Sequence, residues 1–69
     1  MYVEIYVVGG ESIRLDEDAK INGVPIQQLT KQALKESFND KAVELTKFDL
    51  SYVVNTALIT WYLIGDGIH

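Results

Sequence analysis

The chain has 69 residues, no cysteine and a formal net charge of −4, from ten acidic and six basic side chains. These values exclude a disulfide framework and a thiolate metal site, and they disfavour nucleic-acid binding, which depends largely on Lys and Arg. A chain that is 48% hydrophobic and 23% charged is typical of folded domains. We expect one small domain, residues 1–69, with no cofactor. Because its first residues lack a basic segment and a cleavage site, we also expect a cytoplasmic location and no membrane contact.

The first fifteen residues predict a β-hairpin, with β-rich runs on either side of Gly9-Gly10. A three-residue loop, Gly9-Gly10-Glu11, would pair Val7 with Ile13 and Ile5 with Leu15. A two-residue loop would mix polar and apolar residues on both faces. The three-residue register gathers Val3, Ile5, Val7, Ile13 and Leu15 on one face, and Tyr2, Glu4, Tyr6, Val8, Ser12, Arg14 and Asp16 on the other.

A helix is expected to follow, because Pro25 suits a first helical turn and apolar residues recur at helical spacing up to Asn39-Asp40. Its apolar positions are Ile26, Leu29, Ala33, Leu34 and Phe38. Segment 41–48 is ambiguous. Val43 and Leu45 alternate as in a strand, whereas Ala42 and Leu45 continue the helical spacing. We favour a short third strand, which would explain a break at Asn39-Asp40.

The stretch FDLSYVVNTALITWYLIGDG, residues 48–67, is nearly free of charge. Its apolar part, residues 50–64, is shorter than the ~20 residues that a membrane-spanning helix needs. We predict a helix that is capped by Asp49 or Ser51 and ends at Gly65. Its core-facing stripe would be Leu50, Val53, Val54, Ala57, Leu58 and Trp61.

The opposite side of this predicted helix is also apolar, and a helix that is apolar on both sides must be buried on both. We therefore predict a homodimer whose interface contains Tyr52, Ile59, Tyr62 and Leu63. The alternative is a monomer in which this helix lies in the centre of the core. The expected fold class is α+β, in the order ββαβα: an N-terminal hairpin, two helices and a short third strand.

Residues 48–63 resemble the second helix of ribbon-helix-helix regulators. The resemblance rests on a short polar entry, Leu50-Ser51, followed by the pattern Val54-Asn55-x-Ala57-Leu58. It implies a dimeric transcriptional regulator whose paired N-terminal strands read the major groove of DNA.

Side chains suited to catalysis are few. The single His69 is the last residue, no Cys can act as nucleophile, and no base is placed to activate Ser or Thr. We therefore expect no enzymatic activity, and treat the acidic residues 16–18 as a solvated turn.

The preferred functional hypothesis is a small acidic protein that binds and modulates another protein, as accessory or inhibitor proteins of phages and mobile elements do. The polar hairpin face would carry its partner-binding residues, Tyr2, Glu4, Tyr6 and Arg14, because tyrosine and arginine are enriched at interface hot spots. The alternative is the DNA-binding regulator.

Overall fold

The computed structural model describes residues 1–66, which form seven β-strands, two 3₁₀ helices and a single α-helix. The first sheet has the antiparallel order β2-β1-β7 and is built from β1 (Tyr2–Val7), β2 (Ser12–Leu15) and β7 (Ile59–Gly65). The fold is therefore mostly β, and the expected ββαβα arrangement with two helices is wrong.

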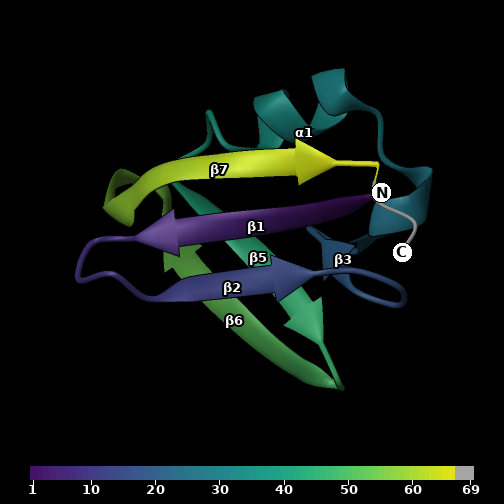
Figure 1. Ribbon diagram of the computed structural model, residues 1–69, viewed down its shortest axis with the longest axis horizontal. Helices are drawn as coiled ribbons and strands as arrows, with labels where there is room; N and C mark the ends of the chain where they lie inside the picture. Colours follow the sequence, from purple (N-terminus) through teal and green to yellow (C-terminus); the bar gives the residue numbers. More distant parts are fainter. Residues whose placement is uncertain (67–69) are drawn as a thin grey trace.

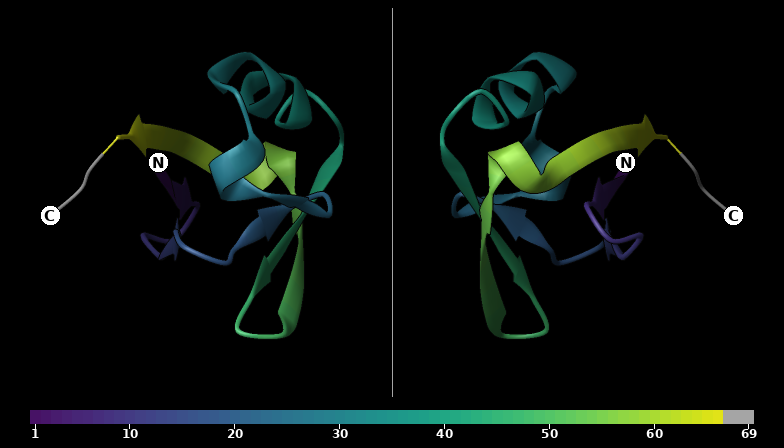
Figure 2. Two further views of the ribbon diagram at one scale, coloured as in Figure 1. Left: turned by 90° about the vertical axis from the view of Figure 1, so that its right-hand side faces the viewer. Right: turned by 90° about the vertical axis from the view of Figure 1, so that its left-hand side faces the viewer.

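The second sheet has the order β4-β3-β5-β6, with every pair antiparallel. Its strands are β3 (Lys20–Ile21), β4 (Val24–Pro25), β5 (Ala42–Lys47) and β6 (Leu50–Asn55). Figure 1 shows β5 and β6 running obliquely behind the first sheet, with α1 above both. In Figure 2 the β5–β6 hairpin projects beyond the rest of the chain.

The N-terminal hairpin is confirmed, but its register is not the expected one. Ile5 pairs with Ile13 instead of Leu15, and the loop is Val8-Gly9-Gly10, one residue earlier than expected. Gly10 thereby takes the last loop position, with φ of +90°, where three-residue loops require a left-handed residue. The register moves by two residues, so each side chain keeps its face, and the predicted division into apolar and polar faces is confirmed.

A second, tighter hairpin joins β3 to β4 through Asn22-Gly23. Both loop residues have positive φ, +52° and +81°, as in a type I′ turn. Pro25 lies at the end of β4, an edge strand, where its missing N–H is tolerated. The expected position of Pro25 in a helix is therefore wrong, and β3 and β4 were not predicted.

The expected helix from Pro25 to Asn39 is wrong as a continuous element. It consists of a 3₁₀ turn, η1 (Ile26–Gln28), and the α-helix α1 (Lys31–Ser37), separated by two extended residues. Thr30 starts α1 as N-cap, because its hydroxyl accepts a hydrogen bond from the Ala33 N–H at 3.0 Å. The apolar face of α1 packs against the core, as expected. The strand expected within 41–48 is confirmed as β5.

The largest correction concerns residues 50–64, which form two strands instead of one helix. A 3₁₀ turn, η2 (Thr56–Leu58), separates β6 from β7. The Thr56 hydroxyl donates to the backbone carbonyls of Asp40 and Lys41, and the Asn55 side chain accepts from the Ala57 N–H. These contacts turn the chain from the second sheet into the first. The residues that resemble a ribbon-helix-helix segment therefore form strands.

The expected core stripe of that segment is largely exposed. Leu50, Val53 and Trp61 are 56%, 73% and 52% exposed. The core instead lies between the two sheets and beneath α1. Its buried members are Val3, Ile5, Leu15, Ala19, Ile21, Ile26, Leu34, Val43 and Leu45. Within residues 1–66, no helix has the length and apolar character needed to cross a membrane.

Candidate partner-binding surface

The outward side of the first sheet, which we call the outer face, carries alternate residues of its three strands. In the middle row Glu4 lies between Arg14 and Leu63, and in the next row Tyr6 lies between Ser12 and Trp61. Because alternate residues of a strand point to opposite sides, these side chains point away from the core, whereas Val3, Ile5 and their neighbours point into it. The outer face comprises Tyr2, Glu4, Tyr6, Ser12, Arg14, Asp16, Trp61, Leu63 and Gly65.

Arg14 is the centre of the charged part of this face. Its Nη1 lies 3.1 Å from Glu4 Oε1, and its Nε lies 3.3 Å from Asp16 Oδ2. The guanidinium carbon also lies 4.0 Å from the centroid of the Tyr2 ring, within cation–π range. Tyr2 can occupy this position because its neighbour across the sheet is Gly65, where a Cβ would overlap the Tyr2 ring.

Tyr6 connects the charged residues to the aromatic part of the face. Its hydroxyl donates a 2.8 Å hydrogen bond to Glu4 Oε2. That hydrogen bond, with a smaller effect of desolvation, raises the pKa of Tyr6 above its ordinary value. On its other side, the Tyr6 ring stacks on Trp61, with centroids 4.1 Å apart and an angle of 6° between the ring planes.

The outer face is thus a set of side chains that hold one another in place while still exposed. Trp61 is 52% exposed, and the Arg14 side chain is 46% exposed. Tyr, Trp and Arg are the residues most enriched at interface hot spots. Because their conformations are already restricted by stacking and hydrogen bonding, less side-chain entropy is lost when a partner binds. The arrangement suits recognition of a surface, not enclosure of a small substrate.

The structure brings the four predicted partner-binding residues together on this face, as their alternation in the sequence implied. Trp61 and Leu63 were missed, because residues 50–64 were assigned to a helix. The signal for them in the sequence is the β-branched and aromatic content of residues 59–64, which favours a strand.

The four residues predicted to form a dimer interface do not share a surface. Tyr62 points inward and packs on Phe38, with ring centroids 4.3 Å apart, and Ile59 also packs against the core. Leu63 lies on the outer face beside Glu4, whereas Tyr52 belongs to β6 in the other sheet. The predicted interface is therefore split among three environments. His69, the only histidine, lies outside the described residues.

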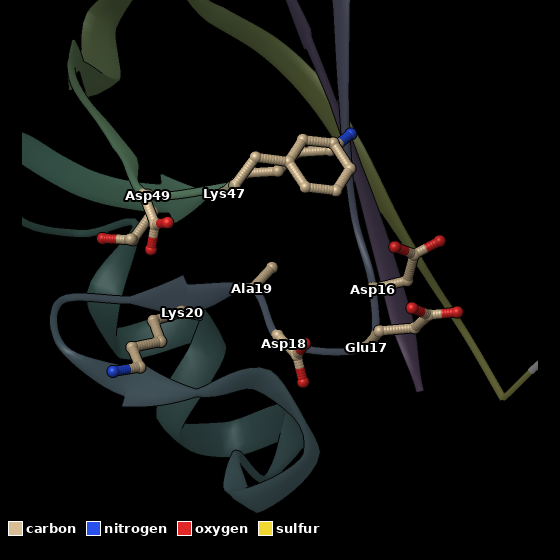
Figure 3. A pocket seen from close by; sticks show the side chains of 9 residues that line it. Asp16, Glu17, Asp18, Ala19, Lys20, Lys47 and Asp49 are labelled. Atoms are coloured by element: carbon tan, nitrogen blue, oxygen red, sulfur yellow. The ribbon is translucent and has the colours of Figure 1, made fainter.

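A second feature is an acidic hollow of about 610 Å³ between the 16–20 loop and the turn joining β5 to β6. Figure 3 shows the carboxylates of Asp16 and Glu17 on the opposite side of this hollow from Asp49. Lys47 does not pair with them, because its Nζ donates to the Arg14 carbonyl at 2.7 Å. The lining carboxylates do not converge on one point. In the part of the chain that the structure describes, no group of three or more acidic, His or Cys residues could hold a metal ion.

Comparison with known proteins adds a family assignment. No curated protein and no solved structure matches the chain significantly. A family model described as Lmo0673 matches residues 1–69. The chain therefore belongs to the Lmo0673 family.

Proposed function

We propose that this chain is a small, non-enzymatic protein that binds another protein through the outer face of its first sheet and thereby modulates that protein. The observation that carries the proposal is the connected row Trp61, Tyr6, Glu4 and Arg14, in which each side chain contacts the next and remains partly open to solvent. This row combines the aromatic and ionic groups on which protein interfaces depend.

The chemistry of the face indicates what kind of partner fits it. Trp61, Tyr6 and Leu63 offer an apolar and aromatic area, beside which the carboxylates of Glu4 and Asp16 flank a single Arg14. The whole chain is acidic, with a net charge of −4. A partner with an apolar centre and a basic rim would meet both features, and opposite charge would raise the rate of association.

Capture from a lysate of the natural host tests the proposal if three forms of the chain are compared with and without nuclease treatment. The first is the unmodified protein, the second is the Tyr6→Ala/Trp61→Ala variant, and the third is the control Val24→Ala in the other sheet. Circular dichroism first verifies that all three are folded.

We expect one discrete protein to be retained by the unmodified chain and by the control, and to be lost with the double variant. Binding of that purified protein, measured by calorimetry, should weaken about 1,000-fold, since two central aromatic residues that each contribute about 2 kcal/mol together contribute about 4 kcal/mol. Equal retention by all three forms would contradict the proposal. Recovery of one DNA region that is lost on nuclease treatment would favour a DNA-binding regulator instead.

A further inference from the structure

Strand β6 is an edge strand that lacks the usual protection against pairing. Within residues 1–66 it pairs with β5 on one side only. Residues 50–64 contain no charged side chain, no Pro and no Gly. Natural edge strands carry such residues, or a bulge, because an open row of N–H and C=O groups invites another strand. Here the edge is also apolar, with Leu50 56%, Tyr52 40% and Val53 73% exposed.

The direction of the backbone hydrogen bonds shows which N–H and C=O groups of β6 point away from β5. The Thr56 N–H donates to the Lys41 carbonyl of the neighbouring segment at 3.0 Å. In an antiparallel ladder, residues alternate between facing the paired strand and facing away from it. The N–H and C=O groups of Ser51, Val53 and Asn55 are therefore directed away from β5. They form a row of three donors and three acceptors along the free edge.

We propose that this edge pairs with β6 of a second copy, antiparallel about a two-fold axis at Val53. Val53 of one copy then lies opposite Val53 of the other, and Ser51 lies opposite Asn55. This register uses all three outward-facing residues of both strands. Centring the axis on Tyr52 would place Asn55 opposite Asp49, whose φ of +63° is not extended. The two four-stranded sheets would become one continuous sheet.

The edge is complementary to itself, since the two-fold register pairs every outward-facing residue of one β6 with an outward-facing residue of the other, and this makes a second copy its occupant. Two chains that each carry a net charge of −4 repel over most of their surfaces, whereas residues 50–65 hold no charge at all. The uncharged edge is therefore where a second copy meets least repulsion. A charged peptide segment would gain nothing from it electrostatically.

The side chains of the paired strands also match. Tyr52 would lie across from Val54 of the second copy, and pairs of aromatic and β-branched residues stabilise antiparallel sheets. The projecting hairpin tip, where Phe48 is 85% exposed, would extend toward the end of the other β6, near Leu58, which is 50% exposed. Of the residues predicted to form the dimer interface, Tyr52 alone belongs to this strand. The inference is independent of the proposed function, since β6 is not part of the outer face.

Sedimentation equilibrium at micromolar to sub-millimolar concentrations tests the proposal directly. The unmodified chain should have twice the 7.8 kDa mass of a single copy. Val53→Lys places like charges next to the two-fold axis and should raise the dimer dissociation constant about tenfold or more. The matched control is Val8→Lys, which makes the same change at a 63% exposed site in the loop between β1 and β2 and should leave the dimer intact.

Amide hydrogen exchange shows whether the dimer uses this edge. The N–H groups of Ser51, Val53 and Asn55 should be protected in the unmodified chain and exchange rapidly in Val53→Lys, while those of Tyr52 and Val54, directed at β5, stay protected in both. A single-copy mass at all concentrations would overturn the proposal. A dimer in which the three outward amides exchange freely would overturn it as well.

Discussion

The contribution of Trp61, which stacks on Tyr6, to the free energy of unfolding can be estimated from its burial. Trp61 is about half buried. A fully buried Trp removes up to about 250 Å² from water, so half of that at about 25 cal/mol per Å² gives about 3 kcal/mol. Because the unfolded chain already buries part of this area, the value is an upper estimate. We expect Trp61→Ala to lower the free energy of unfolding by about 2 kcal/mol.

Part of this loss of free energy should come from the stacking of Trp61 on Tyr6 and not from the burial of Trp61 alone. Stacked aromatic pairs contribute about 0.5–1.5 kcal/mol beyond the area that they bury. The rings of Tyr6 and Trp61 are nearly parallel with centroids 4.1 Å apart, so we expect a coupling of about 1 kcal/mol.

Urea unfolding of the unmodified chain, Tyr6→Ala, Trp61→Ala and the double variant provides this coupling as a double-mutant cycle. All four chains are measured at one concentration, because association would otherwise change their apparent stability. A coupling below about 0.3 kcal/mol, the usual error of additivity, would refute the reasoning that the two rings hold each other in place.

Three further predictions concern other parts of the chain. Leu45→Ala removes a fully buried core side chain, so thermal unfolding should show a loss of about 2–5 kcal/mol, much of the stability expected of a domain this small. Thr30→Ala should cost about 1 kcal/mol in urea unfolding through loss of the N-cap bond to Ala33, whereas Thr30→Ser should restore it. Glu4→Gln should lower the pKa of Tyr6, measured by NMR, because the carboxylate that raises it is removed. Folding raises this pKa, so the contribution of Tyr6 to stability is constant below the unfolded pKa, about 10, and is lost as pH rises through the folded pKa.

The faces of the N-terminal hairpin could be predicted from the sequence because only a loop with an odd number of residues places the apolar residues of both strands on one face. The exact register could not be fixed in this way, since registers that differ by two residues have the same faces. The choice between them lay in the loop, where the requirement for positive φ at the last position selects Gly10 over Glu11. The turn at Asn22-Gly23 carried an even stronger signal for a hairpin, because Asn-Gly is the sequence that type I′ turns prefer, with positive φ at both residues.

The error at residues 50–64 has a physical origin. A helical period fitted the apolar residues because they are dense in this segment and neither strand alternates strictly between apolar and polar residues. The chain nevertheless turns at η2, between the two strands. Thr56 makes that turn by bonding to carbonyls of the segment before β5, a contact distant in sequence that no local pattern reveals. The β-branched content of the segment, including Val53, Val54 and Ile59, was the better guide.

Only the part of the candidate site that comes from the N-terminal hairpin was predicted from the sequence. Tyr2, Glu4, Tyr6 and Arg14 come from one hairpin, whose faces are a local property of the sequence. Trp61 joins them only because β7 pairs with β1, a pairing across more than fifty residues that depends on the whole fold.

The most direct test of the outer face as a binding surface is site-specific photo-crosslinking in the natural host. A photoreactive phenylalanine derivative replaces Trp61 in one variant and Glu36, an exposed residue of α1, in the other. Our account predicts that position 61 forms a covalent adduct with one discrete protein, whereas position 36 does not. Adducts at both positions alike, or at position 36 alone, would contradict the claim that this chain binds its partner through the outer face.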